Sequence, residues 1–264
     1  MSSAVNDFSD VTARRVPPLG GFSLTLLRIE LTRMLRNRRT IVFTLLMPAA
    51  FALIFTNRQD AGSAAGSGNV AAYILISIAL YAAALTAAAT GAMVALERAT
   101  GWSRQLRLTP LKPVAYILVK VTMALIMGGI AIVVVNIVGA VEGKAVMPTH
   151  VWIFGALLAL VCTVTFAALG VFVGYIVPGE NAMQILGPGL AALSFLGGVF
   201  IPLSVYSPVV RDIAYWTPMY GVAEIARSPL TSELPWYAVV NAVVWFGLFV
   251  AGAAWRMSKD TARV

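Results

Sequence analysis

The feature that most limits how this chain can fold is a series of long apolar stretches with almost no charged side chains. Residues 70–96 and 151–177 contain no Asp, Glu, Lys or Arg at all. A helix of about 20 apolar residues spans the hydrocarbon core of a bilayer. The 264-residue chain is 59% hydrophobic and 11% charged, whereas soluble domains are about 25% charged. A water-soluble globule is therefore excluded, and lipid is the expected solvent.

Six such stretches are separated by polar segments, so we expect an all-α integral membrane protein with six transmembrane helices. The expected spans are 41–56, 70–96, 113–140, 151–177, 182–201 and 236–255. Before this 41–255 domain we expect a cytoplasmic segment (1–40), and after it a cytoplasmic tail (256–264). Residues 57–69 are rich in Gly and Ser, which predicts a flexible external linker. The fifth span should be bent or broken, because it contains Gly187, Pro188, Gly189, Gly197 and Gly198.

The positions of lysine and arginine predict the orientation. Fifteen of the 19 precede the first span, lie in the 97–112 loop, follow the last span, or, as Lys120, stand near the start of the third span. Cytoplasmic loops carry the excess of these residues, so both termini should be cytoplasmic. The net charge of +8 then reflects membrane topology, and we expect no nucleic-acid partner. The long Lys120 side chain can extend to the headgroup layer.

Small residues recur at the spacing that brings membrane helices together. Gly170 and Gly174 form one small-xxx-small pair, and Ala83, Ala87 and Gly91 continue the pattern in the second span. Such residues allow the backbones of two helices to approach closely. We expect them to assemble the helix bundle, with a subunit interface as the alternative.

Residues 22–37 have the pattern of an amphipathic helix. Leu24, Leu27, Leu31, Met34 and Leu35 share one arc, and polar residues occupy the other side. An arginine-rich helix of this kind should lie in the cytoplasmic headgroup layer. It is either a topology anchor or an interface helix gripped by a cytoplasmic partner, through Leu24, Leu27, Arg28, Leu31, Arg33 and Arg36.

The loop between spans two and three is short and mixed in charge. Gly101 can end a helix before it, and Pro110 and Pro113 can end one within it. The segment is either a brief surface helix that presents Arg104, Gln105 and Arg107 to the cytoplasm, or merely a positively charged inner loop.

This loop reads E-R-x-x-G-x-x-R-Q-L-R-x-T-P, which closely resembles the coupling-loop signature of ABC-2 type transporter permeases. These are exporter membrane subunits that include drug-resistance permeases of actinobacteria. The resemblance extends over nearly the whole chain, and residues 194–202 and 216–227 look like the other hallmark of the family. It implies a bacterial plasma-membrane protein whose ATPase-coupling residues are Glu97, Arg98, Gly101, Trp102, Arg104, Gln105, Arg107, Thr109 and Pro110.

The resemblance also implies the partners and the mechanism. Two membrane subunits, identical or homologous, would pair with two cytoplasmic ATPase subunits that bind Mg-ATP. Closure of the ATPase pair would move the N-terminal helix and the 97–112 loop, which forms a short coupling helix in the family. The proline-rich residues 202–235 would be external re-entrant helices. Glu224 and Arg227 stand at i and i+3 there and can pair, so Glu224 is either structural or part of a gate.

The chain shows no energy source of its own. The segment 139–145 imitates a phosphate-binding loop but is one residue short and lacks the Ser or Thr after its Lys. With one histidine, His150, and one cysteine, Cys162, no conventional zinc site can be built. We therefore expect no enzymatic activity, no cofactor and no metal in this chain, with ATP hydrolysis supplied by a partner.

The sequence allows several classes of substrate. An apolar, partly aromatic path would suit antibiotics, other amphiphiles or lipids, and multidrug efflux is the leading interpretation. Glycolipid or polysaccharide export, or a stand-alone channel or secondary carrier, are alternatives. The side chains of the path could equally face lipid or pack within the bundle. The candidate residues for the path or its gate are Tyr73, Tyr81, Phe195, Phe200, Pro202, Pro218, Tyr220 and Glu224.

Overall fold

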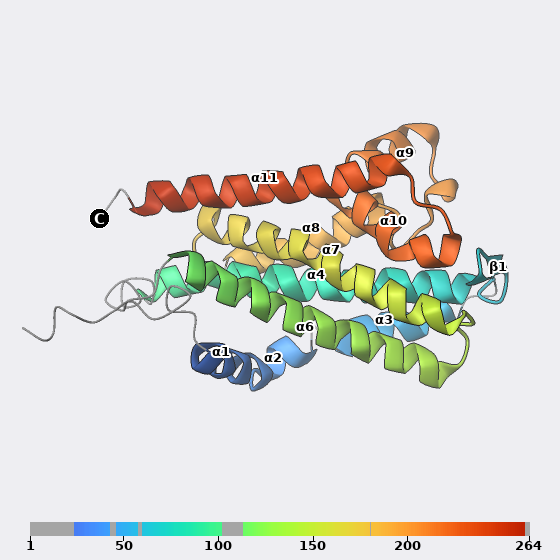
Figure 1. Cartoon of the computed structure of the whole chain (residues 1–264), viewed down its shortest axis with the longest axis horizontal. Coiled ribbons are helices and arrows are strands. Elements are labelled where there is room, and N and C mark those ends of the chain that lie inside the picture. The colour runs from blue at the N-terminus through green and yellow to red at the C-terminus, as the bar shows by residue number, and fades with distance from the viewer. Residues whose placement is uncertain (1–23, 43–45, 58–59, 102–112, 180, 262–264) are drawn as a thin grey trace, which may run out of the picture.

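The computed structural model describes residues 24–42, 46–57, 60–101, 113–179 and 181–261, and this part of the chain is a helical bundle with one small hairpin (Figure 1). The elements, in chain order, are α1 (Leu24–Leu35), α2 (Arg38–Ile41), α3 (Met47–Thr56), β1 (Ala64–Ala65), β2 (Gly68–Asn69), α4 (Val70–Ala99), α6 (Pro113–Glu142), α7 (Thr149–Ile176), α8 (Asn181–Leu196), the 3-10 turn η4 (Leu203–Val205), α9 (Pro208–Tyr215), α10 (Pro218–Thr231) and α11 (Trp236–Thr261).

Four of these helices have the length and composition of membrane spans. They are Val70–Ala99, Ala115–Glu142, Thr149–Ile176 and Trp236–Lys259, and they match four of the expected spans. The first and fifth expected spans correspond to shorter apolar helices, because α3 has 10 residues and α8 has 16. Residues 43–45, within the expected span 41–56, lie outside the described part. An all-helical membrane protein is therefore supported, while the six-span topology stays a prediction.

Helix α4 forms the centre of the bundle and contacts α3, α6, α7, α8 and α10. Its closest approach is to α7. An added Cβ at Gly170 of α7 would lie 2.0 Å from the backbone oxygen of Ala88, and one at Gly91 of α4 would lie 2.5 Å from that of Ala167. The two backbones are in contact, since no side chain separates them. The predicted packing role of these glycines is confirmed.

The interruption expected in the fifth span occurs at only one of its two glycine clusters. Helix α8 continues through Gly187, Pro188 and Gly189, so it is not broken there, and a bend at this cluster stays a prediction. The helix ends at Leu196, and Gly198 has a φ of 76°, a backbone conformation that glycine adopts without steric cost. The chain therefore leaves the helix direction four residues before Pro202.

The segment expected to be a flexible linker is an anchored hairpin. Strands β1 and β2 pair antiparallel, and the Ser67 amide donates to the Leu230 carbonyl at 2.8 Å. The Asn69 side chain accepts from the amides of Ala72 and Val146 at 3.0 and 3.1 Å. The glycine content was misread as flexibility, because Gly66, with a φ of 57°, supplies the left-handed turn that lies against α10.

The segment between α8 and α11 is helical, as expected for 202–235, and α10 packs into the bundle against α7, α11 and α4. The depth at which α9 and α10 lie in a membrane is untested. In Figure 1, α1 and the C-terminal end of α11 lie at one end of the bundle, and the hairpin lies at the opposite end. The charge distribution predicts that the first of these is the cytoplasmic end.

The close contact between α4 and α7 predicts that a single added methyl group at this contact lowers the stability of the protein. We expect Gly170→Ala to lower the free energy of unfolding by roughly 1–3 kcal/mol, as overpacking does. The control is Gly247→Ala in α11, where an added Cβ meets nothing within 4 Å. Thermal unfolding of the purified protein in mild detergent measures both variants. Equal stability of the two would contradict the close packing.

Candidate functional site

Helix α1 has one face covered by the bundle and one face exposed. Leu27, Leu31 and Met34 pack against a methionine- and valine-lined patch of α6. Part of the apolar arc is therefore covered by α6, whereas Leu24 is 74% exposed. The place of α1 in the headgroup layer stays a prediction. Arg28, Arg33 and Arg36 of the predicted interface set are exposed, and they border a shallow groove together with Thr25, Ile29, Thr32 and Asn37.

A buried charge cluster joins α1 to α4 and α6. Lys120 of α6 is 2% exposed, and its Nζ lies 3.4 Å from Glu30 Oε2 of α1. The same ammonium contacts the carboxylate of Glu97, which also accepts a hydrogen bond from the Tyr116 hydroxyl. Lys120 therefore points into the protein, and the expectation that it extends to the headgroups is wrong. Two carboxylates and one ammonium share a site closed to solvent.

The cluster lies at the end of α4, where the predicted coupling loop begins. Glu97 was predicted to be a coupling residue. Its side chain is 2% exposed and lies inside the bundle, and its coupling role stays a prediction. The neighbouring Arg98 donates to the backbone oxygens of Gly174 and Tyr175 in α7, at 3.4 and 3.2 Å. The last turn of α4 is thus bound to α1, α6 and α7 together.

The rest of the predicted coupling set can be placed only in part. Gly101 has a φ of 73°, which ends the helical path after α4. Six predicted coupling residues lie outside the described part of the chain, namely Trp102, Arg104, Gln105, Arg107, Thr109 and Pro110. Their contact with an ATPase stays a prediction.

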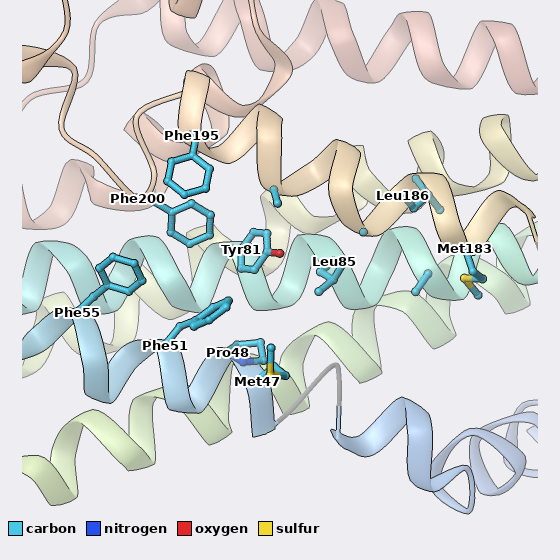
Figure 2. A pocket seen from close by; sticks show the side chains of 13 residues that line it. Met47, Pro48, Phe51, Phe55, Tyr81, Leu85, Met183, Leu186, Phe195 and Phe200 are labelled. Carbon is cyan, nitrogen blue, oxygen red and sulfur yellow. The ribbon is translucent and has the colours of Figure 1, made fainter.

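An apolar pocket of about 630 Å³ opens between α3, α4 and α8 (Figure 2). Three residues of the predicted path, Tyr81, Phe195 and Phe200, line it. Tyr81 carries the one side-chain hydroxyl among the described residues of the lining, which contains no charged group. The other lining residues are Met47, Pro48, Phe51, Phe55, Leu85, Ala89, Met183, Leu186, Gly187 and Ala191.

Five aromatic rings gather at one end of this pocket, while aliphatic side chains occupy the other end (Figure 2). Phe200 is the hub, with ring centroids 4.8 Å from Tyr81, 4.9 Å from Phe195 and 6.0 Å from Phe55. The sequence analysis missed Phe51 and Phe55. Their i, i+4 spacing on α3 could have placed them on one helix face.

The remaining predicted path residues lie away from the pocket. Tyr73 packs its ring 4.5 Å from the guanidinium of Arg227. Glu224 pairs with Arg227 at 2.7 Å, which confirms the predicted i, i+3 pair. Tyr220 packs against Tyr215, with ring centroids 4.9 Å apart. The two predicted prolines begin local elements, because Pro202 precedes η4 and Pro218 is the first residue of α10.

The sequence comparisons define the class of protein. Residues 23–231 match the family described as ABC-2 type transporter, so the chain belongs to this family of transporter membrane subunits. It is also similar to a Bacillus subtilis (strain 168) protein described as "Putative transport permease YvfS". The two are 25% identical over 234 residues, which cover 88% of this chain and 96% of that protein. Such membrane subunits work with an ATPase and in dimeric assemblies.

The buried cluster predicts that Lys120 is needed for stability. We expect Lys120→Met to lower the free energy of unfolding by about 3–5 kcal/mol, because it leaves the carboxylates of Glu30 and Glu97 buried without a cation. The same substitution at Lys144, whose side chain is 43% exposed, should cost less than about 1 kcal/mol. Thermal unfolding in detergent compares the two variants. A tolerated Lys120→Met would show that the cluster is not an ion pair in solution.

Proposed function

We propose that this protein is the permease subunit of an ATP-driven exporter that moves antibiotics or other amphiphilic molecules out of a bacterial cell by alternating access. The observation that carries the proposal is the uncharged, aromatic-lined pocket in a chain of the ABC-2 family. Ligand sites for small molecules are mostly apolar, with few polar groups that fix orientation. Here the Tyr81 hydroxyl is such a group.

The proposed partners are two cytoplasmic ATPase subunits, which bind Mg-ATP, and a second permease, either another copy or a homologue. The 97–112 loop and the exposed arginines of α1 would contact the ATPase. The support is the arrangement of α1, whose apolar residues Leu27 and Leu31 pack on α6 while Arg28, Arg33 and Arg36 stay exposed. A cationic face of this kind suits an acidic protein surface.

The buried cluster would transmit the motion of the ATPase. A displacement of the 97–112 loop acts directly on the end of α4, where Glu97 contacts Lys120 of α6 and, through it, Glu30 of α1. Opposite charges in a site closed to solvent resist separation more strongly than exposed pairs do. The three helices should therefore move together when ATP binds.

A lipid is the second candidate substrate. The cytoplasmic end of the pocket is lined by Leu85, Met183 and Leu186, which suit an acyl chain as well as a drug. A sugar polymer is disfavoured, because a lining with a single hydroxyl offers too few partners for its hydroxyl groups. Export to the outside, with both termini cytoplasmic, completes the proposal.

Charge reversal at the loop should release the ATPase. We expect Arg104→Glu with Arg107→Glu to abolish co-purification of a stoichiometric ATPase from the native membrane in mild detergent, while the permease is still inserted. The control is Arg211→Glu in α9, which lies at the end of the bundle opposite to the C-terminal end of α4 and should retain the ATPase (Figure 1). If the wild-type chain is recovered without any ATPase, under conditions that preserve known complexes, a self-sufficient channel or carrier is favoured instead.

Truncation of a pocket aromatic should weaken the response to substrate. For the reconstituted complex, we expect Phe51→Ala to raise the rhodamine 6G concentration that half-stimulates ATP hydrolysis by about two- to tenfold, because one aromatic contact contributes roughly 0.5–1.5 kcal/mol. Phe154→Ala on α7, where the ring is 53% exposed and does not line this pocket, is the matched control. Stimulation by phospholipid alone would instead favour the lipid candidate.

A further inference from the structure

Arg227 of α10 is fully enclosed at the end of the bundle near the hairpin. It is 1% exposed, although its guanidinium is charged at any physiological pH. It donates to the Gly198 carbonyl at 2.8 Å, to Glu224 at 2.7 Å and to Ser77 Oγ of α4 at 3.4 Å. One arginine thus joins α10, α4 and the turn that follows α8.

A buried charge of this kind is costly unless its partners hold it in place. The Tyr73 ring faces the guanidinium and Glu224 balances its charge, but Arg227 Nε has no hydrogen-bond partner among the described residues. Burial of an unsatisfied donor is costly, because the donor loses its hydrogen bonds to water and gains none in return. An apolar residue at this position would avoid the cost of burying a charge. We therefore expect a contact that an apolar residue cannot make.

The bond from Arg227 to the Gly198 carbonyl is such a contact. Residues 197–200 leave the helical path and are buried, and Gly198 lies two residues before Phe200. The segment is also held by the Val199 amide, which donates to the Ser194 carbonyl at 2.9 Å. Phe200 in turn contacts Tyr81, Phe195, Phe51 and Phe55 at the aromatic end of the pocket (Figure 2).

We propose that Arg227 is a positioning residue that fixes the turn 197–201, so that Phe200 closes the aromatic end of the pocket and sets its affinity for planar amphiphiles. Arg227 does not line the pocket and touches no substrate itself. It acts through the Gly198 carbonyl, from behind the aromatic wall. The part of the proposal that concerns the affinity of the pocket, its pocket half, rests on the proposed function. The part that concerns the position of the turn 197–201, its positioning half, does not.

Hydrogen exchange followed by mass spectrometry tests the positioning half on the purified full chain. We expect Arg227→Gln to speed exchange of the amides in residues 197–201 by at least about tenfold, because a hydrogen bond from a charged donor is lost. Arg227→Lys, which keeps the charge but not the fork of donors, should show a smaller increase. The control, Asn69→Ala, removes anchors of the hairpin and should affect exchange there but not in 197–201. Unchanged exchange in 197–201, or an increase spread over the whole bundle, would overturn the proposal.

Fluorescence anisotropy of rhodamine 6G, with protein-free micelles subtracted, tests the pocket half without an ATPase. We expect Arg227→Gln to raise the Kd at least fivefold, Phe200→Ala to raise it similarly, and Asn69→Ala to leave it within twofold. Faster exchange in 197–201 with an unchanged Kd in Arg227→Gln, while Phe200→Ala binds weakly, would refute the link from Arg227 to affinity. If Phe200→Ala binds as tightly as wild type, the pocket assignment fails, and hydrogen exchange alone decides the role of Arg227.

Discussion

The structure depends on the direct backbone contact between α4 and α7. No side chain separates the two helices at Gly91 and Gly170, so their backbones lie close together. Helices α3, α6, α8 and α10 contact α4 on its other sides. Lipid offers no hydrophobic drive for helices to associate, so the close contact itself must supply dispersion energy. Helix α4 can be central only because its buried face is built mainly from alanine, glycine and small polar residues.

Three of the candidate sites touch α4 at different points along its length. At the hairpin end, Ser77 and Tyr73 meet Arg227. Midway along, Tyr81 and Leu85 form one wall of the pocket. At the C-terminal end of α4, Glu97 joins the charge cluster. A single helix, 30 residues long, therefore connects the proposed ATPase contact to the proposed substrate site. The charges stand at its two ends, and the lining of the pocket between them is neutral.

The sequence predicted the features that are local. Uncharged stretches revealed the long spans, small-residue spacing revealed the contact at Gly170, and the aromatic content of two spans pointed to Tyr81, Phe195 and Phe200. Long-range pairs were not predictable in this way. Glu30 and Lys120 are 90 residues apart, and each could equally have faced the headgroups. The hairpin was misjudged for the same reason, because Ser67 and Asn69 gain their order from Leu230 and Val146. The pocket role of Phe51 and Phe55 depends on their contact with Phe200, beyond the end of α8, which no local pattern supplies.

The distribution of tight and loose packing indicates where the bundle can change shape. Helices α4, α6 and α7 are joined by backbone contact, by the Lys120 cluster and by Arg98, all of which are costly to separate. Helices α3 and α8 instead face α4 across the pocket, where rings meet at centroid distances of 4.8 to 6.4 Å. Aromatic contacts of this kind can re-form after a small shift. We therefore expect α8 to move against a rigid body of α4, α6 and α7. Helix α3 is also held to α6, because Thr56 and Asn57 donate to the Glu142 carboxylate at 2.6 and 2.8 Å. Arg227 of α10 matters here because it joins the turn after α8, at the Gly198 carbonyl, to Ser77 of α4.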